Sequence, residues 1–296
     1  EILIGLVGSE MCIRDSGMGK KKVKISSILL YAVLIFWLLI TVIPILWVFE
    51  NSFKPSEEIL LNGVALPKNL DFSNYRSIFS YPDVNMFRSF FNSFLISGGV
   101  VAGVVCLGGL AAFGLGRFDS GIGKVVDAGM VACLLVPAFA TMIPNFVTVS
   151  RLPIRETYLA VIVPQVAGNL CFAIMLLSSY MRSLPNELDE AAIIDGAGPF
   201  QVLRHITVPL SKPMFATVGI MVFIWSYNDL ITSLVYISDQ KLKPVCVILT
   251  MVSNMHGTDY GAMMAAIFIT VVPVLILYMM SQEMVIKGLT AGAVKG

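Results

Sequence analysis

Six long apolar runs dominate this sequence and limit the folds open to it. They cover approximately residues 26–49, 89–115, 125–149, 158–180, 213–235 and 261–281. The hydrocarbon core of a bilayer, about 30 Å thick, requires roughly 20 apolar residues in a helix. Of the 296 residues, 57% are hydrophobic and 13% are charged, whereas about 25% are charged in an ordinary soluble domain. The sequence therefore predicts an all-α, polytopic membrane helix bundle with six transmembrane helices.

Charge around the first run gives the expected orientation. Just before it stand Lys20, Lys21, Lys22 and Lys24. Positively charged flanks tend to stay on the cytoplasmic side of a membrane. With six crossings both termini are then cytoplasmic, and so is the segment between the fourth and fifth runs.

Residues 1–16, EILIGLVGSEMCIRDS, differ in character from the rest of the chain. Codons for MCIRDS can be chosen that match a sequencing-library transposon adapter read in frame. The stretch also lacks the charged, apolar and small-residue order of a signal peptide. We expect residues 1–16 to be an adapter artefact and the true start to be Met18.

Several chemistries lack their residues in this sequence. The chain has a net charge of +1 and no long basic block, so it lacks the concentrated positive charge that binds nucleic acid. FDSGIGKV fails the phosphate-loop pattern, because Phe118 replaces its first glycine and Val125 its final serine or threonine. The two histidines, His205 and His256, fall on opposite predicted sides of the membrane, and no two of the five cysteines form a C-x-x-C pair. The sequence predicts neither catalysis nor a metal site.

The second run contains a G-x-x-x-G pattern at Gly99 and Gly103. This spacing lets two helix backbones approach closely, so it favours a place in the bundle interior or against a partner. The alternative is that glycine is simply common in membrane helices.

Two acidic residues lie within the runs. Asp127 follows Lys124 by three residues, and we expect the two to pair at the interface. The second lies in the stretch FIWSYNDLITSL, where charge in lipid is usually functional or paired. Tyr227, Asn228 and Asp229 are therefore predicted to line a path for a hydroxylated solute. An interfacial aromatic belt with a capping Asn-Asp pair is an equally open interpretation.

The segment between the fourth and fifth runs is amphipathic and far longer than a turn requires. SLPNELDEAA predicts a helix with Ser183 as N-cap and Pro185 in the first turn, extending to Ile194. DGAG then ends this helix, with Gly196 free to adopt a positive φ. A rigid amphipathic helix of this kind suits a groove on a soluble partner.

A second short helix is predicted from PFQVLRHIT. Its spacing places Phe200, Leu203 and Ile206 along one stripe, and Pro209 and Pro213 end it before the fifth run. Together the two helices form a compact helix-turn-helix.

This segment resembles the EAA loop of bacterial ABC importer permeases, whose pattern is E-A-A-x3-G-x9-I-x-L-P. Only Val208 departs from the pattern, where it replaces leucine. The resemblance implies a role in ATPase coupling for Glu190, Ala191, Ala192, Asp195, Gly196, Ile206 and Pro209. FIWSYNDL and the C-terminal GLTAGAVKG are similar to the carbohydrate-uptake branch, in particular the second permease of the maltose and glycerol-phosphate type.

The resemblance extends from Met18 to Gly296 and implies a type I importer permease fold with coupling helices. The implied divisions are a cytoplasmic N-terminus at 17–25, a first helix and extracytoplasmic loop at 26–86, a permease domain at 87–282 with the EAA loop at 184–212, and a cytoplasmic tail at 283–296.

A permease of this family is a multi-pass subunit of the bacterial cell membrane that works by alternating access. The resemblance implies a second permease, two cytoplasmic ABC ATPase subunits, an extracytoplasmic solute-binding protein and membrane lipid as partners. It implies no cofactor in this chain, because ATP and Mg bind to the partner ATPase.

Three other functions are weighed against sugar import. The chain could carry a non-sugar solute, such as an amino acid, a polyamine or a metal ion. A secondary transporter would need its own coupling groups, and the runs contain few charged residues. A membrane enzyme would need a nucleophile, a metal cluster or an acid-base pair, which the sequence does not offer.

Overall fold

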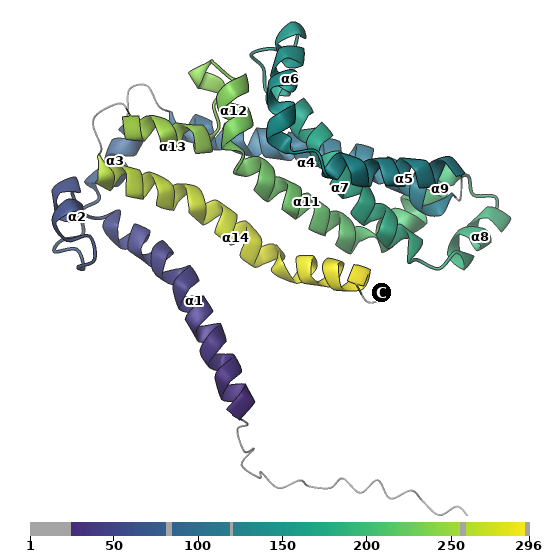
Figure 1. Ribbon diagram of the computed structural model, residues 1–296, viewed down its shortest axis with the longest axis horizontal. Helices are drawn as coiled ribbons and strands as arrows, with labels where there is room; N and C mark the ends of the chain where they lie inside the picture. Colours follow the sequence, from purple (N-terminus) through teal and green to yellow (C-terminus); the bar gives the residue numbers. More distant parts are fainter. Residues whose placement is uncertain (1–24, 81–84, 119–120, 255–258, 294–296) are drawn as a thin grey trace, which may run out of the picture. The chain divides into compact units, whose positions relative to one another are not determined.

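The computed structural model describes residues 25–80, 85–118, 121–254 and 259–293, and every regular element in these ranges is a helix (Figure 1). Residues 1–16, interpreted above as an adapter artefact, lie outside the described residues, as does His256. Contacts divide the chain into two units, residues 1–46 and residues 47–296.

The described part of the first unit is one apolar helix. α1 runs from Ile25 to Asn51 and so continues beyond the unit boundary. Pro44 lies inside it. Residues 29–51 are long and apolar enough to cross a membrane, which confirms the first predicted span.

The second unit holds the other elements. They are α2 (Ser56–Asn62), α3 (Ser73–Ser80), α4 (Met86–Arg117), α5 (Gly121–Leu134), α6 (Ala138–Arg151), α7 (Leu159–Arg182), α8 (Glu187–Ile194), α9 (Pro199–Val202), the π-helical turn η1 (Leu203–Thr207), α10 (Val208–Leu210), α11 (Lys212–Tyr227), α12 (Leu230–Tyr236), the 3₁₀ turn η2 (Gln240–Leu242), α13 (Val245–Asn254) and α14 (Tyr260–Ala293).

Among the described residues, four helices are long and apolar enough to span a membrane. Two further pairs of helices are bent, and if each pair counts as one span, the number of spans rises to six. The third predicted span, 125–149, is one of these pairs. Residues 123–134 and 138–151 meet at 99°, and Pro137 is the N-cap of the second helix. A proline disfavours helical geometry in the residue before it, which accounts for the break.

The fifth predicted span, 213–235, is also interrupted. α11 ends at Tyr227 and α12 begins at Leu230, with Asn228 and Asp229 between them. On its other side α11 is bent by 76° from residues 199–210. Hydropathy alone does not register such breaks, because it counts residue types and not backbone direction.

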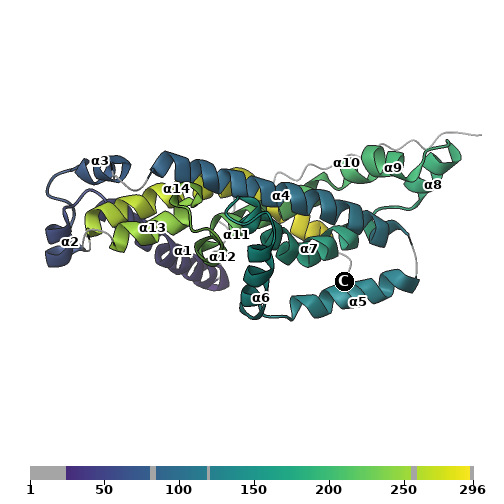
Figure 2. The same ribbon diagram turned by 90° about the horizontal axis from the view of Figure 1, so that it is seen from above.

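The core of this unit forms where α4 packs along α7 and α11 (Figure 2). A Cβ added to Gly99 would lie 2.8 Å from Cδ1 of Ile162, and one added to Gly103 would lie 2.7 Å from Cγ2 of Val166. Both distances are too short for a side chain, so the two glycines allow the backbones of α4 and α7 to approach. The close-packing interpretation of the G-x-x-x-G pattern is confirmed.

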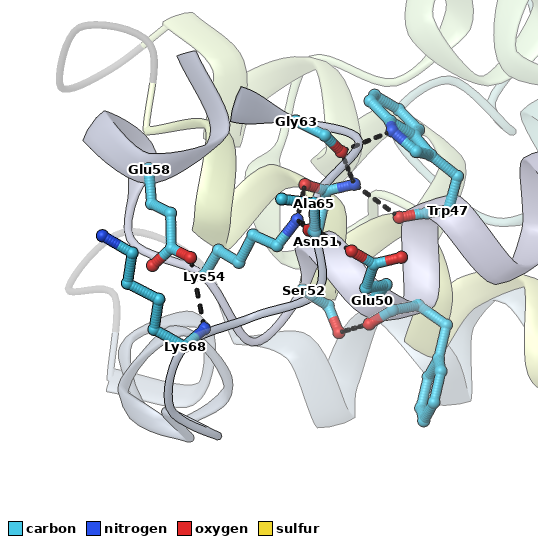
Figure 3. A network of polar contacts seen from close by, with 10 residues as sticks. Trp47, Glu50, Asn51, Ser52, Lys54, Glu58, Gly63, Ala65 and Lys68 are labelled. Carbon is cyan, nitrogen blue, oxygen red and sulfur yellow. Dashed lines mark hydrogen bonds and ion pairs between the residues drawn. The ribbon is translucent and has the colours of Figure 1, made fainter. Parts of the chain in front are cut away.

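A fully buried lysine organises the segment that follows α1 (Figure 3). Nζ of Lys54 donates to Oε1 of Glu50 at 2.9 Å, to Oδ1 of Asn51 at 3.1 Å and to the carbonyl oxygen of Ala65. These three acceptors match the three donors of an ammonium group. The Lys54 network therefore buries a charge without leaving it unpaired.

Long-range contacts fasten the same segment to α14. Oγ of Ser56 donates to Oδ1 of Asp259 at 2.8 Å. Nδ2 of Asn74 donates to the carbonyl oxygen of Lys54 at 2.9 Å, and a Cβ on Gly261 would lie 2.6 Å from that same oxygen. Only glycine fits at the start of α14.

Candidate functional site

The predicted helix-turn-helix forms an exposed elbow. α8 ends at Ile194, and Gly196 adopts φ +86. The N–H of Ala197 donates to the carbonyl oxygen of Ala192 at 2.9 Å, closing the bend. The predicted positive φ at Gly196 is confirmed.

The start of α8 differs from the prediction. α8 begins at Glu187, and Ser183 is instead the C-cap of α7, with its hydroxyl donating to the carbonyl oxygen of Tyr180. Residues 183–186 therefore form a turn. Arg117, which binds the carbonyl oxygens of Leu184 and Pro185, accounts for this difference.

The outer side of the elbow carries apolar side chains. None of the residues of α8 is buried. Exposed fractions are 62% for Ile193, 85% for Ile194 and 67% for Phe200. These three side chains leave apolar surface exposed at the bend between two short helices.

The second arm of the elbow contains a π-helical turn that the sequence did not predict. The N–H of Val208 donates to the carbonyl oxygen of Leu203, five residues earlier. Pro209 follows, and in an α-helix its ring would clash with the carbonyl group four residues back. Widening the helix before the proline relieves this clash.

The buried face of this arm differs from the prediction. Val202, Leu203 and Thr207 are buried, whereas Phe200 is exposed. The predicted stripe of Phe200, Leu203 and Ile206 is therefore wrong, because Phe200 is exposed while its neighbours Val202 and Leu203 are buried.

A hollow of about 360 Å³ lies inside the elbow. Its lining includes Ala192, Asp195, Gly196, Gln201, His205 and Ile206. The structure thus brings together four of the predicted coupling residues. Glu190, Ala191 and Pro209 lie outside this lining and are exposed. The coupling role of all seven stays a prediction.

The predicted pairing of Asp127 with Lys124 is wrong. Asp127 on α5 pairs with the guanidinium of Arg182 at the end of α7. The reason is tertiary, because α5 packs against α7 and brings the carboxylate to that helix end.

A second hollow lies beside the break between α11 and α12, and we call it the cavity. It has a volume of about 530 Å³ and is bounded by α6, α7, α11 and α12. Its polar lining includes Thr141, Asn145, Gln165, Asn169, Asn228 and Asp229, and its aromatic lining is Phe139, Trp225 and Tyr236. Amides and hydroxyls dominate its polar groups.

The carboxylate of Asp229 occupies the wall of the cavity and caps α12. Its Oδ1 accepts from the N–H of Thr232 at 3.0 Å, and its Oδ2 accepts from Nε2 of Gln165 at 2.8 Å. Oε1 of Gln165 in turn accepts from the hydroxyl of Ser226. Of the polar pair predicted from the sequence, Asp229 is therefore held by helix α7, whereas Nδ2 of Asn228 donates to the carbonyl oxygen of Ile224 on α11 at 2.8 Å.

Gln165 is a residue that the sequence reasoning missed. It is only 7% exposed, and it stands within the fourth apolar run directly after Pro164. A buried amide inside an apolar run was the available signal, because such a group needs a hydrogen-bond partner.

Tyr227 lies apart from Asn228 and Asp229. It is 1% exposed, and its hydroxyl donates to the carbonyl oxygen of Thr270 at 3.3 Å. Its ring packs against those of Phe94 and Phe223. Asn228 and Asp229 line the cavity and Tyr227 does not. Their role in a path stays a prediction.

Glu156, which lies between α6 and α7, joins its loop to the loop that follows α12. Its carboxylate accepts from the N–H of Ser238 at 3.1 Å and from the N–H of Asp239 at 3.3 Å. Hydrogen bonding by the Ser238 side chain and by these N–H groups holds the pKa of Glu156 below its usual value. Glu156 adopts φ +56, an uncommon conformation for a residue with a side chain.

Long apolar helices, a polar cavity at a helix break and an exposed helical elbow define a membrane transport component. The family described as binding-protein-dependent transport system inner membrane component matches residues 104–290. The chain belongs to this family. It is the permease subunit of an ABC importer and a transport subunit rather than an enzyme.

Two relatives illustrate the similarity. The chain is 32% identical over 264 residues to the diacetylchitobiose uptake system permease protein NgcG of Streptomyces coelicolor, covering 88% of this chain and 87% of that protein. It is 30% identical over 270 residues to the trehalose/maltose transport system permease protein MalG of Thermococcus litoralis, covering 91% of this chain and 97% of that one.

The fold is also similar to that of a solved structure. A chain of a bacterial ABC transporter involved in the import of the acidic polysaccharide alginate superposes with a TM-score of 0.77, at 21% identity. The match covers 90% of this chain and 99% of the other. Membership of the family implies, in general terms, a partner permease, an ATPase and a solute-binding protein.

Proposed function

We propose that this permease imports a sugar or oligosaccharide. The uptake systems of the two relatives are named for diacetylchitobiose and for trehalose and maltose. These names support a carbohydrate solute for the present chain.

The cavity beside the α11–α12 break is the observation that carries the proposal. Side-chain amides such as those of Asn145 and Asn169 offer both donors and acceptors, as sugar hydroxyls require. Trp225, 43% exposed, offers an apolar ring face in the same wall. A neutral, hydroxylated solute matches this lining.

The alternative solutes match the lining less well. A polyamine carries several positive charges, and Asp229 is the single acidic residue among the lining residues of the cavity. An amino acid requires a cation for its carboxylate, and the lining residues of the cavity include no lysine or arginine.

We further propose that the EAA loop at 184–212 docks on a cytoplasmic ABC ATPase, which binds ATP and Mg. Exposed Ile193, Ile194 and Phe200 support this, because an apolar helix face suits a groove on a soluble partner. Both termini are then cytoplasmic, and the solute-binding protein acts on the opposite side.

Transport by the complete importer tests the solute class. The permease would be reconstituted with its partner permease, ATPase and binding protein, and uptake of labelled diacetylchitobiose, maltotriose, glutamine and spermidine would be measured. We expect uptake of a saccharide only, driven by ATP inside the vesicles. Uptake of glutamine or spermidine in its place would contradict the sugar assignment. Uptake driven by an ion gradient without ATP would instead indicate a secondary transporter.

A further inference from the structure

Arg117, the last residue of α4, reaches the elbow from a neighbouring helix. Its side chain is 3% exposed. Nε of the guanidinium donates to Oδ2 of Asp189 at 2.7 Å. Nη1 donates to the carbonyl oxygens of Met181 and Leu184, both at 3.0 Å, and to Oδ1 of Asn186 at 3.2 Å. Nη2 donates to the carbonyl oxygen of Pro185 at 3.1 Å. The turn between α7 and α8 is therefore folded around one side chain.

These contacts require an arginine. The last carbonyl groups of a helix have no partners within it, and Arg117 supplies donors for the end of α7 while its Nε binds α8. A guanidinium presents five N–H groups in a rigid plane, whereas a lysine offers one compact ammonium. Lysine at this position would keep the charge and lose most of the geometry.

Asp189 depends on Arg117 in return. It is the acidic residue in the first turn of α8 that is turned inward, whereas Glu187 and Glu190 are exposed. Its side chain is 16% exposed, and its Oδ1 is buried without a hydrogen-bond partner among the described residues. Removing Arg117 would leave this carboxylate buried and unpaired, which is strongly unfavourable.

A reciprocal contact fixes α4 to α7 at the same end. Nη2 of Arg182 donates to the carbonyl oxygen of Leu115 at 3.0 Å. Between Leu115 and Arg117, a Cβ on Gly116 would lie 3.1 Å from the carbonyl oxygen of Ser178. Each helix end thus holds the other, and the backbones are in close approach between the two arginines.

We propose that Arg117 is a positioning residue for coupling: it fixes α8 to the ends of α4 and α7, so that these elements move as one body when an ATPase moves α8. α7 continues from Arg182 to Gln165, which binds Asp229 in the cavity wall. The proposal rests on the proposed docking of the EAA loop on an ATPase.

Pulsed electron paramagnetic resonance can measure this attachment in the assembled importer. The native cysteines would be replaced by serine, and spin labels placed at Gly114→Cys on α4 and Glu187→Cys on α8, both of which are exposed. With Arg117 present we expect one narrow distance distribution that is the same without nucleotide and with ATP and vanadate. With Arg117→Met we expect the distribution to broaden and to change with nucleotide.

The same variants would be assayed for ATP hydrolysis. Arg117→Met should retain the ATPase on co-purification and keep its basal hydrolysis, while solute-stimulated hydrolysis falls by about tenfold. In Arg117→Lys, solute-stimulated hydrolysis should lie between that of the wild type and that of Arg117→Met. Lys124→Met is the matched control, since it removes an exposed cation from α5 near the same helix ends. If Arg117→Met does not assemble, Arg117→Lys is measured in its place.

The outcomes separate this proposal from the one on which it rests. Unchanged distances and wild-type stimulation in Arg117→Met would overturn the positioning role while leaving the docking of the EAA loop intact. An ATPase that binds and responds normally when the elbow itself is altered at Gly196 would instead overturn the docking assignment.

Discussion

Gln165 on α7 and Asp229 at the α11–α12 break are joined by a hydrogen bond of 2.8 Å from Nε2 to Oδ2. The contact links two helices at the wall of the cavity. Because Asp229 also caps α12, its carboxylate serves the structure and lines the cavity at once.

Replacing Asp229 with leucine should lower solute uptake by about tenfold while the ATPase still co-purifies, because charged residues within membrane segments are usually functional. The variant also loses the cap of α12, at about 1 kcal/mol. Asp229→Asn controls for the loss of the cap, because its side-chain oxygen still accepts the hydrogen bond from the N–H of Thr232. Normal uptake by a normally expressed Asp229→Leu variant would leave this residue with a capping role alone.

Gly196→Val should weaken ATPase association or abolish solute-stimulated hydrolysis. A Cβ at Gly196 would meet nothing within 4 Å, so the effect comes from the backbone, where a branched residue at positive φ is strained by about 1–3 kcal/mol. Gly196→Asn is the matched control, because asparagine tolerates this conformation. For both variants, co-purification measures ATPase association, and hydrolysis in vesicles measures stimulation by the solute. Equal coupling in the two variants would contradict the requirement for this bend.

Ala192→Trp tests the inner side of the elbow. Ala192 lines the hollow of about 360 Å³, and a large ring there should displace α9 or block the ATPase groove. We expect normal membrane levels and normal pairing with the second permease, together with loss of ATPase association. Wild-type association would show that the hollow takes no part in docking.

Gly103→Ala should destabilise the packing of α4 against α7 by about 1–3 kcal/mol, because its Cβ would overlap Val166. The control is Gly98→Ala, which would meet nothing within 4 Å. Thermal unfolding in detergent compares the two. A Gly103→Ala variant that melts at or above the Gly98→Ala temperature would contradict the close approach.

Glu156→Gln should change how stability depends on pH. A carboxyl group with a lowered pKa in the folded state stabilises that state above its ordinary pKa of 4.5, and the stabilisation is lost as pH falls through the lower, folded value. Wild type should therefore melt higher than Glu156→Gln at pH 7, and the difference should vanish in strong acid. The exposed Glu57→Gln serves as control. A constant difference between wild type and Glu156→Gln across this range would rule out the hydrogen-bonded carboxylate.

The apolar runs and the bend at Gly196 could be predicted from the sequence, because length, hydropathy and a left-handed glycine are local properties. The breaks at Pro137 and at Asn228 could not be placed by hydropathy, which carries no directional information. Asp127 shows the same limit, since its neighbour Lys124 was the expected partner and Arg182, far along the chain, is the observed one.

The residues most relevant to coupling were the hardest to predict. Arg117 stands at the end of an apolar run, where a cation is expected at a membrane interface whatever its contacts. Only the packing of α4 beside the turn between α7 and α8 brings it to Asp189. The hydrogen-bond partner of Gln165 could not be predicted, because Asp229 is 64 residues away in the sequence.

The Lys54 network has a consequence for biogenesis. All acceptors of the ammonium, at Glu50, Asn51 and Ala65, lie within 11 residues of it. The Ser56–Asp259 contact spans 203 residues. During synthesis the charge can thus be neutralised as soon as residue 65 has emerged, long before α14 exists. The acceptors of this buried charge all come from residues 50–65, and α14 supplies none of those described.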